Sequence, residues 1–164
     1  MIAIVNKNFI SFLDGANQID EHVLNTPTNQ NIAIILALLR IWNRNFLNLP
    51  MHGIMPYDHR LARLPAWAQQ LEMESNGKSV DIRGDALSQP ASPLIWGEAG
   101  TNAQHSFFQY LHQGIEQQSL DILIPRNSLG CSLPDGWQES HKTLVYNALA
   151  QAEALAIGED NQQE

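Results

Sequence analysis

The sequence predicts an α/β protein, built as a three-layer α/β/α sandwich around a small, mostly parallel sheet. Three short apolar runs, at residues 51–55, 94–96 and 120–124, have the length and composition of buried strands. Segments with the spacing of amphipathic helices separate them. This alternation is typical of parallel strands that are covered by helices on both faces. The 164 residues, 44% of them hydrophobic, suit one domain with a real core. We place that domain at residues 1–158, followed by a polar tail at residues 159–164.

Two helices are predicted before the first strand. Apolar residues recur at helical spacing from Phe9 to Val23, and the Thr-Pro-Thr of residues 26–28 ends the pattern. From Gln30 to Phe46, apolar side chains occur on nearly every face, which is typical of a buried helix. The first half of the chain is therefore predicted to be mainly helical.

The remaining elements alternate between strands and helices. Pro56 closes the first strand, and an amphipathic helix over residues 61–71 should end near Gly77. The second strand leads through a tight loop into a helix over residues 102–113. After the third strand, an apolar stripe over residues 144–155 marks the last helix.

The composition disfavours several classes of function. Nine basic and 17 acidic residues give a formal charge of −8, and no basic stripe is present that could neutralise nucleic-acid phosphates. A small anionic ligand stays possible, because backbone N–H groups can bind it. Cys131 is the only cysteine and residues 1–20 lack a signal-peptide pattern, so we expect a reducing, cytoplasmic location. The longest apolar run, residues 32–39, is too short to span a bilayer, and no membrane partner is expected.

The segment after the second strand could carry chemistry. Ligands of open parallel sheets lie at the carboxyl ends of the strands, and a helix N-terminus favours developing negative charge. Gly97 and Gly100 permit a tight backbone path, and Thr101 could cap the helix. His105 lies about one turn inside that helix, so its ring could face the strand ends. A merely structural, half-buried histidine is the alternative, and spacing alone favours it.

A second segment combines an amide with a carboxylate. Gln70 and Glu74 are four residues apart and therefore share one helix face. Glu74 lies where the helix unwinds into Ser-Asn-Gly, and a carboxylate at a helix C-terminus is unfavourable with the helix dipole. Spacing alone favours a solvated glutamate, with a functional one as the alternative. In the functional case, we expect Glu74, like His105, to lie towards the carboxyl ends of the strands.

Other recognisable site patterns are missing from the sequence. It contains no Walker-type phosphate-binding loop (G-x-x-x-x-G-K-S/T), no G-x-S-x-G nucleophile elbow and no G-x-G-x-x-G dinucleotide-binding pattern. The other histidines show no metal-ligand spacing; they are His22, His52, His59, His112 and His141.

The two candidate segments resemble the glucose-6-phosphate isomerase (phosphoglucose isomerase) family. The resemblance rests on MESNGK at residues 73–78, preceded by Gln69-Gln70, and on WGEAGTNAQH at residues 96–105. Further stretches agree in order, including YDHRLAR at residues 57–63 and LAQAEAL at residues 149–155. The likeness covers roughly residues 8–158.

The resemblance implies a definite activity and site. The family interconverts glucose 6-phosphate and fructose 6-phosphate through an enediol, without a metal or organic cofactor, and its members are dimers with two sugar-isomerase (SIS) domains per subunit. Glu74 matches the catalytic base of the family, and Gln70 matches a residue that lines the substrate site. His105 matches a histidine that assists ring opening in the site of the neighbouring subunit. A carboxylate that moves a proton and a histidine that titrates near neutral pH suit this chemistry.

The chain also departs from the family pattern. Leu71 and Ala103 stand where glycine is common, Ala99 where proline is common, and His59 where glutamine is usual. The first SIS domain, which holds the phosphate, is not part of these 164 residues. The resemblance therefore implies the second SIS domain of a larger enzyme, inactive by itself. A non-catalytic SIS-type module for sugar-phosphate binding or dimerisation is the alternative.

Overall fold

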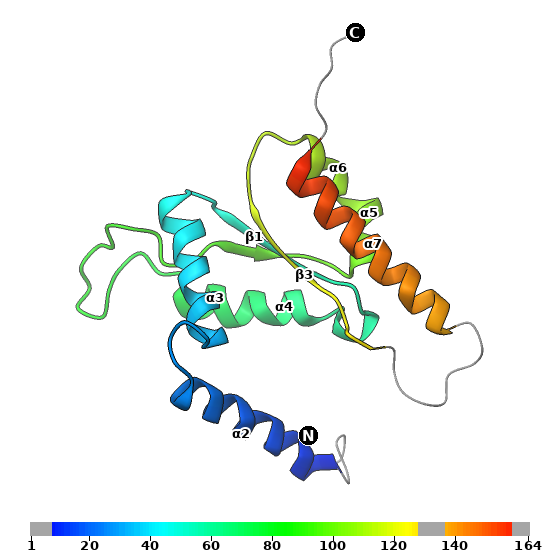
Figure 1. Ribbon diagram of the computed structural model, residues 1–164. Helices are drawn as coiled ribbons and strands as arrows, with labels where there is room; N and C mark the ends of the chain where they lie inside the picture. Colours follow the sequence, from blue (N-terminus) through cyan, green and yellow to red (C-terminus); the bar gives the residue numbers. More distant parts are fainter. Residues whose placement is uncertain (1–7, 128–136, 159–164) are drawn as a thin grey trace. The chain divides into compact units, whose positions relative to one another are not determined.

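The computed structural model describes residues 8–127 and 137–158 (Figure 1). These residues form two compact units, one that ends at Leu47 and one that begins at Asn48. Cys131 and the predicted tail at residues 159–164 lie outside the described residues. A single domain over residues 1–158 stays a prediction.

The first unit is a pair of helices, as predicted. Helix α2 spans Phe9–Asn25, helix α3 spans Ile32–Ile41, and a π-helical turn, η2, continues α3 over Trp42–Phe46. The buried Asn31 joins the two helices, because its Oδ1 accepts a hydrogen bond from the Ile34 N–H at 3.3 Å while its Nδ2 donates to the Val23 carbonyl at 2.8 Å. Asn31 is thus the N-cap that starts α3.

The prediction that the second helix is buried was wrong for this chain. No residue of α3 is buried. Eight large apolar side chains of α3 and η2 are exposed: Ile32, Ile35, Leu36, Leu38, Leu39, Ile41, Trp42 and Phe46. A helix that is apolar on every face needs cover on every side, and a two-helix unit supplies cover on one side only.

The second unit is built on a three-stranded parallel sheet, which confirms the predicted strands. Strands β1 (Met51–Pro56), β2 (Leu94–Trp96) and β3 (Ser119–Leu123) lie in the order β2-β1-β3. The central strand is the most buried, and Met55 on β1 and Ile95 on β2 are fully enclosed. All three strands are short, and β1 and β2 are mostly apolar, as is typical of strands in a sheet that is covered on both faces.

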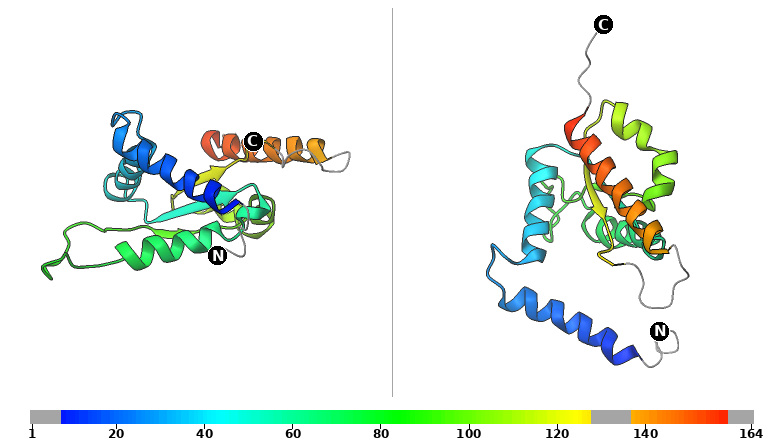
Figure 2. Two further views of the ribbon diagram at one scale, coloured as in Figure 1. Left: turned by 90° about the horizontal axis from the view of Figure 1, so that it is seen from below. Right: turned by 45° about the vertical axis from the view of Figure 1, so that its right-hand side comes forward.

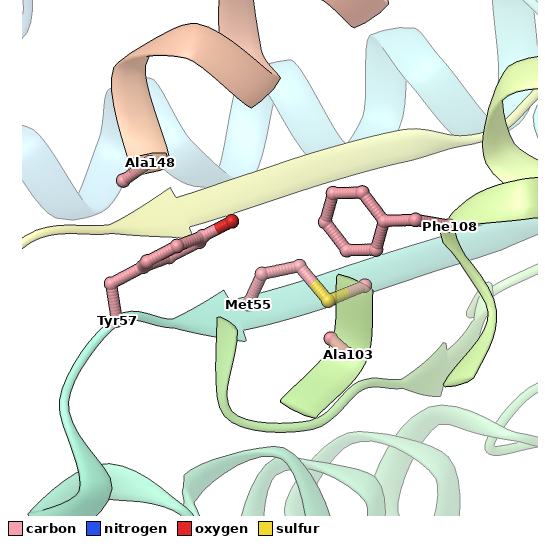
Figure 3. Packing of buried hydrophobic residues seen from close by; sticks show 5 residues of the cluster. All are labelled: Met55, Tyr57, Ala103, Phe108 and Ala148. Atoms are coloured by element: carbon pink, nitrogen blue, oxygen red, sulfur yellow. The ribbon is translucent and has the colours of Figure 1, made fainter. Parts of the chain in front are cut away.

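Helices lie on both sides of the sheet, so the three-layer sandwich is confirmed. Helix α4 (Leu64–Gln69) lies on one side, and α7 (Trp137–Ile157) lies on the other, as the left view of Figure 2 shows. Helices α5 (Gly100–Ser106) and α6 (Phe108–Gln113) join α7 on its side. The core there is the cluster drawn in Figure 3, formed by Met55, Tyr57, Ala103, Phe108 and Ala148.

The single helix predicted over residues 102–113 is two helices. Phe107, with a φ of −139°, interrupts the helix between α5 and α6. The break lets its ring meet Trp96 edge to face, with the centroids 4.6 Å apart, while Phe108 enters the core. Continuous apolar spacing through these positions gave no sign of the interruption. Thr101 is not the cap, because the N-cap position belongs to Ala99 and no side chain caps it.

Candidate functional site

Glu74 lies at the end of a π-helical turn that continues α4. This turn, η4, spans Gln70–Glu74 and therefore begins and ends with the two predicted site residues. Single π-turns inside α-helices occur frequently at functional sites. The Gln69 side chain donates from Nε2 to the Ile95 carbonyl at 2.9 Å, which fixes the start of η4 against β2.

Hydrogen bonds to backbone carbonyls close the end of the same turn. Lys78 donates from Nζ to the carbonyls of Glu74 and Ser75, at 2.6 and 2.9 Å, and so satisfies groups that a helix end leaves without partners. The Gly77 N–H donates to the Met73 carbonyl at 2.9 Å. A Cβ at Gly77 would lie 2.2 Å from that carbonyl oxygen, so only glycine fits. The MESNGK segment thus fixes the backbone at Glu74 through its own hydrogen bonds.

Gln70 and Glu74 line one hollow, which confirms that they share a face. The hollow has a volume of about 570 Å³, and its other lining residues are Gln69, Met73, Leu94 and Ile95. Both Gln70 and Glu74 are exposed, so neither side chain is part of the core. The arrangement presents a carboxylate and an amide together to whatever enters the hollow.

Glu74 does not lie at the carboxyl ends of the strands, where it was expected. The hollow is bordered by Leu94, the first residue of β2. A helix that follows a parallel strand starts near the carboxyl end of that strand and runs back towards the amino end. Because Glu74 comes last in the α4–η4 segment, it arrives at the amino end of β2.

His105 is carried by α5, whose start is fixed by two glycines. Gly97 has a φ of 147°, and a Cβ there would lie 2.0 Å from the Ile54 carbonyl oxygen. A Cβ at Gly100 would lie 2.3 Å from the ring of Tyr57. Both glycines therefore serve a close approach to β1 and its end. His105 itself is exposed, in the last turn of α5.

The two predicted catalytic residues are not brought together within one chain. His105 is not among the residues that line the hollow of Glu74. The α4–η4 segment lies on one side of the sheet, whereas α5 packs on the other through Ala103 in the core cluster. The structure thus joins Gln70 with Glu74 and leaves His105 apart.

A buried polar group that sequence reasoning missed links β1 to β3. His52 is 3% exposed; its Nδ1 lies 2.8 Å from Ser119 Oγ, and its Nε2 lies 3.0 Å from Asp121 Oδ2. A histidine inside an otherwise apolar strand was the available signal, since a buried polar side chain needs partners. Within residues 8–127 and 137–158, no three His, Cys, Asp or Glu side chains are grouped closely enough to hold a metal ion.

The turn after β1 is fixed by charge. Asp58 accepts hydrogen bonds from the Arg60 backbone N–H and from its Nε, both at 2.9 Å, and caps the short 3₁₀ helix η3 (His59–Leu61). The Arg60 guanidinium holds the pKa of the Asp58 carboxyl below its usual range.

In the part of the chain that the structure describes, no helix is both long and apolar enough to cross a membrane.

Comparison with known proteins identifies the family. The family model for phosphoglucose isomerase matches residues 1–164. The glucose-6-phosphate isomerases of Chlorobium phaeobacteroides and Xanthobacter autotrophicus are 50% and 48% identical over 96% of this chain, which spans 27% and 28% of their lengths.

A solved structure agrees with the sequence comparison. The crystal structure of a glucose-6-phosphate isomerase from Chlamydia trachomatis superposes on 94% of this chain with a TM-score of 0.82 and 42% identity, and the match covers 30% of that chain. The sandwich is therefore of the SIS type. With a family model that matches throughout and relatives that agree in sequence and in fold, the chain belongs to the phosphoglucose isomerase family.

Proposed function

We propose that this chain is the second SIS domain of an enzyme that interconverts glucose 6-phosphate and fructose 6-phosphate, an aldose–ketose isomerisation of glycolysis and gluconeogenesis. One observation carries the proposal: Gln70 and Glu74 line the same exposed hollow in a chain of the phosphoglucose isomerase family. Because the chain spans about 28% of its relatives, the activity is proposed for the full-length protein.

The reaction needs one group that takes a proton from carbon and returns it. In the open-chain aldose, the Glu74 carboxylate removes the proton from C2. The electron pair forms the C1–C2 double bond, and O1 gains a proton to give the enediol. The same carboxylic acid then delivers its proton to C1, while O2 loses a proton and becomes the ketose carbonyl. The oxidation at C2 balances the reduction at C1, so no external oxidant, metal or organic cofactor is proposed.

The geometry of η4 supports these roles for Glu74 and Gln70. The Glu74 side chain is exposed in the hollow, and its backbone is held by Lys78. A glutamate whose backbone is held and whose carboxylate is exposed in the hollow is open to a substrate carbon. The Gln70 amide beside it can donate to and accept from sugar hydroxyls.

His105 is proposed to act in the site of a neighbouring subunit. It is exposed and does not line the hollow of its own chain, so a homodimer with shared sites would give it a substrate. The imidazole nitrogens can both donate and accept a proton, which suits proton exchange with the ring oxygen of the closed sugar. We further propose a cytoplasmic location for the enzyme.

The isolated 164-residue chain is proposed to lack activity. By the family resemblance, the groups that hold the phosphate belong to the first SIS domain. Binding energy from a remote phosphate helps to position the reacting carbons, so its loss lowers turnover as well as affinity.

The test is the isomerase activity of the full-length protein with Glu74→Gln, compared with Glu72→Gln. Glu72 lies on the same turn but does not line the hollow. Glu74→Gln should lower kcat by about 100-fold or more, since general-base catalysis contributes about 10²–10⁴. Glu72→Gln should remain close to wild type.

Two outcomes would go against the proposal. Equal activity in Glu74→Gln and wild type would remove Glu74 as the base. A wild-type protein that binds sugar phosphates but does not interconvert them would support the non-catalytic binding module instead.

A further inference from the structure

The side chain of Tyr57 connects the sheet to the helix that carries His105. Tyr57 follows β1 directly, is 1% exposed and belongs to the core cluster. Its backbone N–H donates to the Leu123 carbonyl at 2.8 Å, so the residue is anchored to two strands. Figure 3 shows its ring at the end of β1, among the other cluster residues. Burial raises the pKa of the Tyr57 hydroxyl, which stays protonated at neutral pH.

Two contacts join this ring to α5. A Cβ at Gly100 would lie 2.3 to 2.5 Å from three ring atoms, so the first residue of α5 lies directly against the ring. One turn later, Gln104 donates from Nε2 to the Tyr57 hydroxyl oxygen at 2.9 Å. Both contacts fall on the same face of the helix, because the two residues are four positions apart.

These contacts fix the direction in which His105 points. Helix α5 has seven residues, too few to be stable without tertiary contacts. Successive residues of an α-helix are rotated by about 100°. Once Gln104 is held against Tyr57 and Ala103 is buried, His105 is turned outwards, in agreement with its exposure.

We propose that Tyr57 is a positioning residue for His105: its ring seats the start of α5 and its hydroxyl holds Gln104, which sets the place and orientation of the imidazole. The inference rests on the proposed role of His105 in ring opening. In that step the C1 hydroxyl loses a proton, the C1 carbonyl forms, the bond from C1 to the ring oxygen breaks, and the ring oxygen gains a proton.

Ring opening can be measured apart from isomerisation. In the open chain, rotation about C1–C2 presents the other face of the aldehyde, and closure then gives the other anomer. Enzyme-catalysed exchange between the α and β anomers of glucose 6-phosphate therefore reports ring opening without the C1–C2 proton transfer. Exchange NMR on the full-length protein measures this rate.

The expected result for Tyr57→Phe is selective. The variant keeps the ring and loses only the bond to Gln104, so anomer exchange should fall by about 10-fold, within the range for a misplaced catalytic group. Tyr110→Phe is the matched control, because that exposed tyrosine on α6 also bonds a side chain, Glu116. It should leave the exchange rate unchanged. Gln104→Ala removes the same bond from the other partner and should reproduce the loss if Tyr57→Phe folds poorly.

A double variant separates positioning from general support of the fold. In a His105→Ala background, Tyr57→Phe should cause no further loss of anomer exchange, because the effects of substitutions that act through one group do not add. A further 10-fold loss there would overturn the proposal, as would wild-type exchange in both Tyr57→Phe and Gln104→Ala. If His105→Ala alone left anomer exchange intact, the role of His105 would fail and Tyr57 would have nothing to position. Loss of anomer exchange in His105→Ala with a neutral Tyr57→Phe would refute the positioning inference alone.

Discussion

At the residue scale, close approaches of the backbone explain why particular glycines precede His105. Gly97 lies against the Ile54 carbonyl, and Gly100 lies against the Tyr57 ring. The sequence predicted a tight loop from these two glycines, and that was confirmed. The contact of Gly100 with Tyr57 could not be predicted, because Tyr57 is distant in the sequence and only folding brings its ring to α5.

We predict that Gly100→Ala destabilises the full-length protein by about 1–3 kcal/mol, the usual cost of overpacking a core. The added methyl would lie less than 3 Å from a buried ring that has no free side to move to. Urea denaturation monitored by circular dichroism measures the change.

Gly15→Ala is the matched control for this substitution. It also replaces a helical glycine, but nothing lies within 4 Å of the new Cβ. It should be neutral or stabilising, by up to about 1 kcal/mol. Equal effects of the two substitutions would contradict the steric account of Gly100.

At the scale of the elements, strand prediction succeeded and helix detail did not. Short apolar runs bounded by Gly and Pro identify buried parallel strands, since few other elements show that pattern. The break at Phe107 and the π-turn at Gln70–Glu74 arise from tertiary contacts, which apolar spacing does not record. For the same reason the spacing of Gln70 and Glu74 predicted their common face, but not the end of the sheet at which they lie.

The exposed apolar surface of α3 indicates that another part of the full-length protein covers this helix. Contiguous apolar surface of this extent marks a region that another part of a protein covers. The chain spans about 28% of its relatives, so the full-length protein has further length with which to cover the helix.

We predict that the isolated chain binds a hydrophobic dye such as ANS more strongly, per molecule, than the full-length protein. Substituting Leu36 and Leu39 by Gln should lower dye binding, because both side chains are exposed on α3. Ala33→Gln, on the same helix, removes little apolar surface and serves as the control. Equal dye fluorescence of the isolated chain and the full-length protein would show that α3 stays uncovered.

At the scale of the whole molecule, the proposed catalytic residues belong to different faces of the second unit. Glu74 and Gln70 line a hollow beside the start of β2, and His105 is carried on α5 across the sheet. In the proposed homodimer, one subunit therefore offers a base to one substrate and a histidine to the other. This separation is the physical basis of the proposed shared site.

The most direct measurement of this central claim is complementation between two inactive full-length variants. Glu74→Gln and His105→Ala are mixed, dissociated and reassociated, and isomerase activity is measured in purified heterodimers. Because one site of each heterodimer would then contain both intact residues, we predict about half of the wild-type activity. Heterodimers that form but stay as inactive as the parent variants would contradict a site built from Glu74 of one subunit and His105 of the other.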